Sequence, residues 1–187
     1  MRIMSGIDKI LTRNILDKFQ GKNPLYVIIV DKKLYPVIFD DILSYEKLYG
    51  DQQPVILLDT SVLDPQLTIQ VLAIINKITP KARVLRLNNP YRALKELMIT
   101  GKTVLIVTRK EPDLRTYIEL NQIINNNKVY LLLPKVTALP SEYLIIKLEN
   151  SHIIIQGLVG NEKIRYIIVR GRKKRQLKID AWLLITG

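Results

Sequence analysis

Residues 25–59 read LYVIIVDKKLYPVIFDDILSYEKLYGDQQPVILLD, and this stretch decides the fold. It opens with Leu25–Val30, a continuous apolar run rich in β-branched side chains, which predicts a strand buried on both faces. Val37–Leu48 has the apolar spacing of a helix, and Pro36 is acceptable in a first helical turn. Pro54–Leu58 predicts a second buried strand. A helix between two buried strands is the connection that parallel strands require.

The same alternation of strands and helices continues to residue 133, and the pattern changes after Pro140. Further helices are predicted at Pro65–Ile78, Pro90–Ile99 and Leu114–Asn125, and further strands at Arg83–Leu87, Thr103–Val107 and Lys128–Leu133. Strand-like segments with short connections then follow at Tyr143–Leu148, His152–Leu158, Arg165–Val169 and Leu177–Ile185. We therefore expect an α/β fold, in which a mostly parallel sheet has helices on both faces and a C-terminal antiparallel strand and hairpin extension. Residues 1–187 are expected to form one domain.

The N-terminal stretch Ile3–Phe19 places apolar residues three and four positions apart, which predicts one amphipathic helix or two short ones. Two roles are open for its stripe, which consists of Ile3, Ile7, Ile10 and Leu11. The stripe packs into the core, or it forms a docking surface for a protein partner.

The composition is that of a globular protein, with 48% hydrophobic and 25% charged residues in 187. There is no cysteine and a single histidine, His152, which excludes disulfides, thiolate chemistry and metal sites built from Cys or several His. No apolar run approaches the length of a spanning helix, so we expect a cytoplasmic protein. The absence of Cys and the use of Ile and Lys suit a thermophile.

The charge of the chain points to a polyanionic partner. Lys and Arg number 29 and Asp and Glu number 17, a net charge of +12. Residues 163–178 carry eight cations and no acid. We predict that a basic turn or hairpin in this window binds DNA phosphates, with Lys135 as an additional contact; the predicted set is Arg170, Arg172, Lys173, Lys174, Arg175, Lys178 and Lys135. The alternative is a solvated surface.

Residues 100–103 read TGKT, which is similar to the end of a phosphate-binding loop, but the surrounding sequence excludes that motif. The motif needs a glycine at position 96, where Glu96 stands, and it should lead from a strand into a helix rather than the reverse. The turn that has the correct context, Asp31–Pro36, contains no glycine. We therefore predict a turn at 100–103, and no bound cofactor or metal.

Acidic residues offer two further candidates for chemistry. Asp40 and Asp41 occupy successive helix positions, which do not face each other, so a solvated helix face is favoured over a paired site. Asp59 and Asp64 flank the end of a predicted buried strand, where open α/β sheets bind ligands. For Asp64, capping of the helix that begins at Pro65 is the alternative.

Several segments, in order, resemble the core of RecA/RadA-like ATPases, including the KaiC-like branch. Val55–Pro65, which reads VILLDTSVLDP, is similar to the family's second core strand, which ends in Asp-Thr/Ala-Glu before a proline opens a helix. Ser5–Leu11 resembles the lead-in to the first strand, and Tyr143–Leu148, Arg165–Val169 and Trp182–Gly187 resemble the closing strands. The resemblance implies a RecA-like sheet over nearly the whole chain.

The residues that perform phosphoryl transfer in this family are replaced here. Ser61 stands where the family has a glutamate that orients water, Thr108 where it has the Mg²⁺-site aspartate, and Lys135 where it has a polar sensor residue. The resemblance thus implies a catalytically inactive paralog that binds DNA and assists recombination or repair with a recombinase, a related paralog or a second copy. Two alternatives remain: a scaffold subunit that does not bind DNA, and an enzyme with a rebuilt nucleotide site around Lys32, Asp59 and Asp64.

Overall fold

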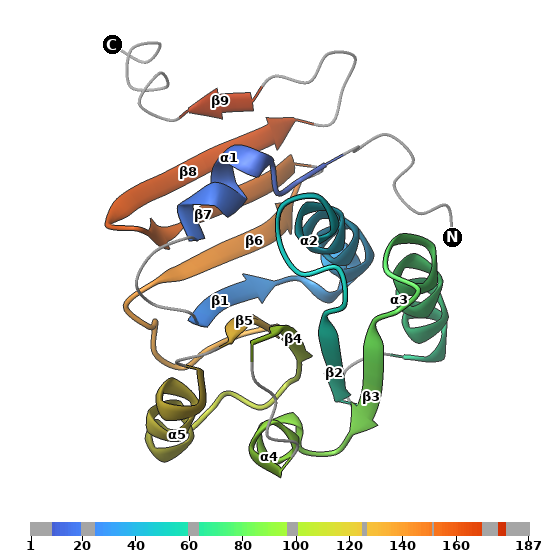
Figure 1. Cartoon of the computed structure of the whole chain (residues 1–187). Helices are drawn as coiled ribbons and strands as arrows, with labels where there is room; N and C mark the ends of the chain where they lie inside the picture. Colours follow the sequence, from blue (N-terminus) through green and yellow to red (C-terminus); the bar gives the residue numbers. More distant parts are fainter. Residues whose placement is uncertain are drawn as a thin grey trace, which may run out of the picture.

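The computed structural model describes residues 9–19, 25–59, 64–96, 101–124, 127–150, 152–169 and 176–178. Across these ranges one sheet of nine strands forms, in the order β3-β2-β4-β5-β1-β6-β7-β8-β9 (Figure 1). The strands are β1 (Leu25–Val30), β2 (Val55–Asp59), β3 (Arg83–Leu87), β4 (Thr103–Val107), β5 (Lys128–Leu133), β6 (Tyr143–Glu149), β7 (His152–Val159), β8 (Glu162–Val169) and β9 (Gln176–Lys178). All pairs from β3 to β6 are parallel, and the pairs from β6 to β9 are antiparallel. The predicted fold class is confirmed.

The parallel strands are as fully buried as their apolar runs predict. Every residue of β1, β2 and β4 is buried, and β5 is buried from its second residue onward. The strand β3 differs because it lies at one edge of the sheet, where Arg83 and Arg86 are exposed. Continuous apolar runs therefore correspond to strands that are covered on both faces.

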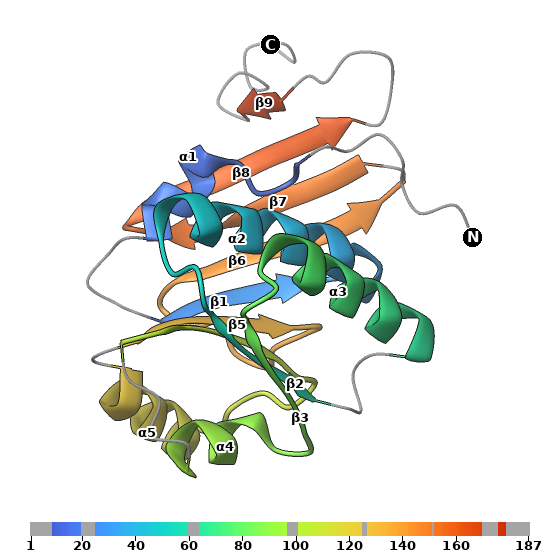
Figure 2. The ribbon, with the colours of Figure 1, turned by 45° about the vertical axis from the view of Figure 1, so that its right-hand side comes forward.

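Helices lie on both faces of the sheet (Figures 1 and 2). On one face lie α1 (Arg13–Leu16), the 3-10 helix η1 (Asp17–Phe19), α2 (Tyr35–Tyr49) and α3 (Pro65–Ile78). Their apolar side chains share one core with alternate residues of the sheet, including Ile28, Leu105 and Ile146. The short helix α4 (Pro90–Glu96) and α5 (Leu114–Ile124) cover the other face, where Leu94 and Leu120 join a second core cluster.

Two helix starts show how local side chains fix the connections. The Asp64 carboxylate accepts a 2.8 Å hydrogen bond from the Leu67 N–H, so Asp64 caps α3 as the capping alternative predicted. Asp31 caps the 3-10 helix η2 (Lys32–Leu34), which continues directly into α2. For this reason α2 begins at Tyr35, two residues before the predicted start.

The prediction of helix over the N-terminal stretch is wrong at residues 9–12, which precede α1 without helical structure. The N–H groups of Ile10 and Leu11 donate to the Asp41 Oδ2 atom at 2.7 and 2.8 Å. Asp41 is 2% exposed, so the expectation of a solvated face is also wrong for this residue. Ile10 and Leu11 are buried in the core, as the packing interpretation predicted, whereas Ile3 and Ile7 lie outside the described residues.

The C-terminal strands form an antiparallel meander whose two sides differ. Leu144, Ile146, Ile153, Ile155 and Ile164 pack into the same core as α2. Because side chains alternate along a strand, the residues between these positions lie on the opposite face. The β7–β8 turn uses Gly160 and Asn161 at φ +58° and +63°, and the Gly160 N–H donates to Glu142 at 2.8 Å. β8 begins at Glu162, three residues before the predicted start.

Candidate functional site

At the C-terminal ends of the parallel strands, a buried hydrogen bond joins two neighbouring strands. Asp59 ends β2 and Thr108 follows β4, and their side chains are 2% and 0% exposed. The Thr108 hydroxyl donates to Asp59 Oδ2 at 2.9 Å and accepts the Lys110 N–H at 3.1 Å. The carboxylate at this edge therefore takes part in a structural hydrogen bond.

The structure does not gather the three residues considered for a rebuilt nucleotide site. Lys32 follows β1 and Asp59 ends β2, and β5 and β4 lie between these strands. Three strand spacings separate the two strand ends by roughly 14 Å. Asp64 caps α3 through the Leu67 N–H. Lys32 and Asp59 thus lie at the ends of strands that are not neighbours, and the two carboxylates accept hydrogen bonds from groups of the protein itself.

The TGKT turn lies at the opposite end of the parallel strands, where β4 begins. Gly101 has a φ of +66°, and the Lys102 ammonium lies 3.7 Å from the Asp51 carboxylate. The Thr103 N–H donates to the same carboxylate at 3.0 Å. Lys102 thus forms an ion pair within the protein, which agrees with the prediction that residues 100–103 are not a phosphate-binding loop.

Beside this turn, a fully buried glutamate binds three side chains from two strands. Glu46 of α2 is 0% exposed and lies 2.6 Å from the Lys128 ammonium. The hydroxyl groups of Tyr130 and Thr103 donate hydrogen bonds to the Glu46 carboxylate at 2.7 and 3.0 Å. Gly50 leaves the room for this group, because a Cβ there would overlap Glu46 Oε2. The cluster joins α2 to β4 and β5 and is structural.

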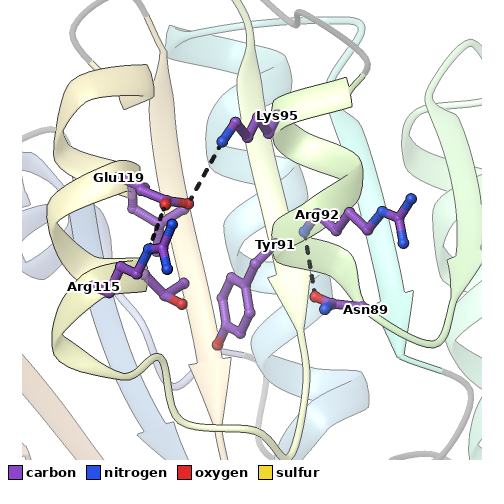
Figure 3. Close-up of a pocket in the computed structure, with 8 residues that line it drawn as sticks. Asn89, Tyr91, Arg92, Lys95, Arg115 and Glu119 are labelled. Atoms are coloured by element: carbon purple, nitrogen blue, oxygen red, sulfur yellow. Dashed lines mark hydrogen bonds and ion pairs between the residues drawn. The ribbon is translucent and has the colours of Figure 1, made fainter.

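A pocket of about 370 Å³ lies between α4 and α5 (Figure 3). Its lining includes three cations and one carboxylate, and the charged members are Arg92, Lys95, Arg115 and Glu119. Sequence reasoning missed this pocket, because the only local signal is a pair of charged residues four positions apart on each helix. Such pairs are typical of solvated helix faces.

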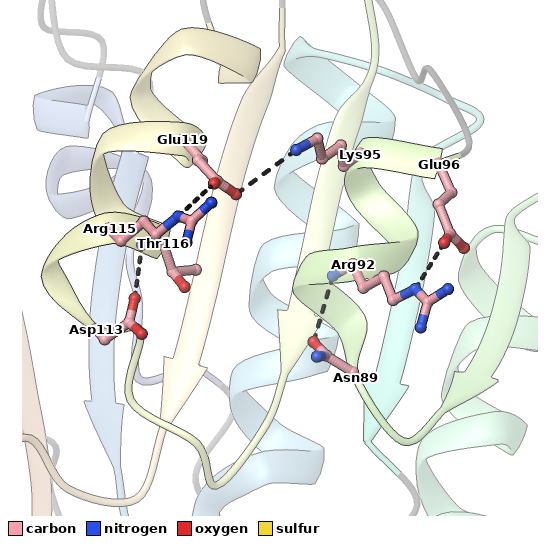
Figure 4. A network of polar contacts seen from close by, with 8 residues as sticks. All are labelled: Asn89, Arg92, Lys95, Glu96, Asp113, Arg115, Thr116 and Glu119. Atoms are coloured by element: carbon pink, nitrogen blue, oxygen red, sulfur yellow. Dashed lines mark hydrogen bonds and ion pairs between the residues drawn. The ribbon is translucent and has the colours of Figure 1, made fainter.

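The cations of this pocket are largely neutralised by neighbouring acids (Figure 4). Arg115 and Lys95 lie 3.2 and 4.0 Å from Glu119, and Arg92 lies 2.6 Å from Glu96. An anion would have to compete with these carboxylates for exposed side chains. The pocket is therefore a weak candidate for a ligand site.

Most of the predicted DNA-binding set lies outside the described residues. Arg170, Arg172, Lys173, Lys174 and Arg175 belong to this group. The structure does describe the backbone of Lys178, which pairs with Tyr166 where β9 forms the outer edge of the sheet. Lys135 is exposed in the connection between β5 and β6. Segment 170–175 thus joins two antiparallel neighbours, β8 and β9.

A basic face that sequence reasoning did not assemble lies on β6 and β8. Lys147 of β6 and Lys163 and Arg165 of β8 are exposed and lie on the face opposite α2. Within the described part of the chain, none of the three side chains is in an ion pair or hydrogen bond. Lys163 and Arg165 stand two residues apart, which is a visible signal, but the inclusion of Lys147 requires the register of β6, β7 and β8.

Tyr166 and His152 have ordinary structural surroundings. Tyr166 is partly buried against the core cluster that contains Ile153. His152 Nδ1 lies 2.8 Å from the backbone oxygen of Asn150. Trp182 lies outside the described residues.

Among the described residues no three acidic or histidine side chains come together as metal ligands, and no helix is long and apolar enough to cross a bilayer. Comparison with protein-family models and with curated proteins yields no match to this chain. Functional inference therefore rests on the residues and their arrangement.

Proposed function

We propose that this protein binds DNA through the segment between β8 and β9, and that it acts without catalysing phosphoryl transfer. The observation that carries the proposal is that residues 170–175 connect β8 to β9, two antiparallel neighbours of which β9 is the outermost strand of the described sheet. Five of these six residues are Arg or Lys, and Lys178 follows in β9. A concentration of cations at an edge can approach several phosphates of one nucleic acid.

Binding of this kind is expected to depend on salt and to discriminate little among base sequences. Each cation that neutralises a phosphate releases counterions, so affinity falls steeply as the salt concentration rises. Phosphate contacts position a protein on nucleic acid without reading its sequence. The protein would thus hold DNA in a general manner and leave sequence or structure selection to a partner.

The absence of catalysis in this proposal is supported by the edge where the parallel strands end. Thr108, which replaces the Mg²⁺-site aspartate of RecA/RadA-like ATPases in the resemblance, donates its hydroxyl proton to Asp59. Lys32 stands three strands away from Asp59. Phosphoryl transfer needs a metal and a phosphate-holding cation in one place, and the residues that the resemblance aligns with these roles do not supply them.

The biological role within this proposal is that of an accessory factor in recombination or repair. It rests on the similarity of Val55–Pro65 and of the closing strands to RecA/RadA-like proteins. The partner would be a recombinase, a related paralog or a second copy of this chain, in the cytoplasm. The parallel sheet followed by antiparallel strands agrees with the architecture that this similarity implies.

The proposal is tested by fluorescence anisotropy of labelled single-stranded and duplex DNA across a salt series. The hairpin variant carries Arg172→Ala, Lys173→Ala, Lys174→Ala and Arg175→Ala. Its control removes the same charges at the far edge of the sheet, where Lys77, Lys81, Arg83 and Arg86 are exposed. Each of these four is changed to Ala.

We expect the wild type and the control to bind DNA with a steep dependence on salt, and the hairpin variant to bind more weakly with a shallower slope. Equal losses in the hairpin variant and the control would mean that only net charge matters, which contradicts the assignment. A wild type that does not bind near physiological salt would favour the scaffold alternative.

A further inference from the structure

The face of β6, β7 and β8 opposite α2 is not covered by any helix in the described part of the chain. On this side of the sheet the second core cluster includes α4, α5 and the parallel strands, and reaches no farther than Ile145 of β6. The connection 134–142 lies on the same side, since Val136 packs against that cluster. Beyond β6, no helix of the described residues lies over this face (Figure 2).

The strand register arranges this face in rows that run across the three strands. One row consists of Tyr143, Leu158 and Lys163, and the next of Ile145, Gln156 and Arg165. The third row consists of Lys147, Ile154 and Ile167. Apart from the three exposed cations, the side chains of these rows are partly buried. Each row thus combines apolar surface with one cation.

The charge on this face is positive. The first three rows contain no acid, and the fourth places Glu149 of β6 opposite His152 of β7. Glu162 belongs to the other face, where it contacts Lys18 of η1. The Cα atoms of Lys163 and Arg165 are about 7 Å apart along β8, and Lys147 lies across two strand spacings, about 10 Å. The cations are spread in two dimensions.

We propose that this face, defined by Lys147, Ile154, Lys163, Arg165 and Ile167, binds single-stranded DNA. The inference rests on the proposed DNA-binding function and names the form of nucleic acid and the surface that holds it. The cations would contact phosphates, and the apolar side chains between them would pack against exposed bases. Arg165 and Lys163 lie on β8, the strand that leads into segment 170–175.

The apolar component favours a single strand over a duplex. In a duplex the bases are stacked on one another, so a sheet face meets mainly sugars and phosphates. A single strand offers unstacked bases, which bind to apolar or aromatic surface irrespective of sequence. Ile154 and Ile167 stand next to each other across β7 and β8, and Lys147 completes their row. This arrangement suits a strand in which every nucleotide carries one phosphate and one base.

The charged component is tested with a face variant that carries Lys147→Gln, Lys163→Gln and Arg165→Gln. Its control carries Lys77→Gln, Lys81→Gln and Arg83→Gln, which remove two lysines and one arginine at the far edge. The probe is oligothymidine of about 20 nucleotides, longer than the roughly 4–16 nucleotides covered by a single-strand-binding domain. We expect the face variant to lose affinity. The slope of log K against log salt should become shallower by about 2, since each of three lost phosphate contacts on a single strand contributes about 0.7.

The apolar component is tested separately with Ile154→Thr and Ile167→Thr, which keep β-branched side chains in both strands. We expect weaker binding of oligothymidine with an unchanged salt slope, because packing of bases on apolar surface releases no counterions. Circular dichroism and the Tm check the fold of each variant. The face variant changes only exposed charges, so its result does not depend on packing of the core.

The outcomes separate this inference from the proposed function. If the hairpin variant loses affinity while the face variant binds like its control, the face assignment is overturned and the hairpin assignment stands. Duplex bound more tightly than oligothymidine would overturn the choice of single-stranded DNA. A loss in the face variant without a loss in the hairpin variant would support the face and overturn the hairpin. If the wild type binds neither probe, both proposals fail.

Discussion

The hydroxyl of Thr108 and the carboxylate of Asp59 are joined by a 2.9 Å hydrogen bond between the ends of two neighbouring parallel strands. Both side chains are buried. The pair occupies the edge at which open α/β sheets usually bind their ligands. In this protein, a hydrogen bond between two of its own side chains stabilises these strand ends.

Replacement of Thr108 by Val keeps the shape of the side chain and removes its hydroxyl. Asp59 loses a buried donor and the Lys110 N–H loses its acceptor. We expect the free energy of unfolding to fall by about 1–3 kcal/mol, measured by urea denaturation. DNA affinity should not change. An unaltered denaturation midpoint would show that the bond contributes little to stability.

Nucleotide is expected to leave the thermal stability unchanged. Lys32 and Asp59 lie at the ends of strands that are separated by β5 and β4, and Asp59 already accepts a hydrogen bond from the Thr108 hydroxyl. A ligand present at a hundred times its Kd would add about 2.7 kcal/mol to the stability of the folded state. Differential scanning fluorimetry with Mg-ATP and Mg-ADP tests this point. A rise in Tm with either nucleotide would support the rebuilt nucleotide site instead.

Lys128 is expected to matter for stability because it is the counter-charge of the fully buried Glu46, at 2.6 Å. The change Lys128→Met leaves the carboxylate buried without this partner, and we expect a loss of about 3 kcal/mol. Lys147→Met, on the exposed sheet face, is the matched control and should stay within about 0.5 kcal/mol of the wild type. Equal effects in urea denaturation would argue against a stabilising role for the buried pair.

Asp41 is expected to make stability depend on pH. Burial raises the pKa of its carboxyl from 3.8 to about 7, although the N–H groups of Leu11 and Ile10 act in the opposite direction. The folded state therefore holds this proton more tightly than the unfolded state. The stabilisation is complete below about pH 4 and is lost as the pH rises through 7, by up to about 4 kcal/mol.

The variant Asp41→Asn isolates this effect. Its side-chain oxygen can still accept from Ile10 and Leu11, but it has no proton to lose in this range. Between pH 4.5 and pH 8, we expect the difference in unfolding free energy between wild type and variant to move steadily in favour of the variant. Urea denaturation at several pH values measures this difference. Parallel stability curves for the two proteins would contradict the role of Asp41.

The sequence predicted the strands of the parallel half well, because burial on both faces leaves a continuous apolar run such as Val104–Val107. The course of the N-terminal stretch could not be predicted in the same way. Its apolar spacing continues through Ile10 and Leu11, yet their N–H groups bind Asp41, some thirty positions along the chain. A local pattern does not contain this contact.

The candidate surface was only partly visible in the sequence for a similar reason. Lys163 and Arg165 stand two residues apart in a strand, so their common face follows from alternation. Lys147 joins them only because β7 pairs with both β6 and β8 in the observed register. The basic composition of segment 170–175 is visible in the sequence, whereas the open face of β6, β7 and β8 depends on which strands the helices leave uncovered.

The central claim is that DNA lies along the C-terminal antiparallel half of the sheet. Photo-crosslinking of the full chain to an oligonucleotide that carries 5-iododeoxyuridine, followed by mass spectrometry of the linked peptides, tests it most directly. We expect the crosslinks to fall in β6, β7 and β8 and in the segment that leads to β9. Crosslinks confined to α3 and β3, or to the turns after β1 and β2, would contradict the account.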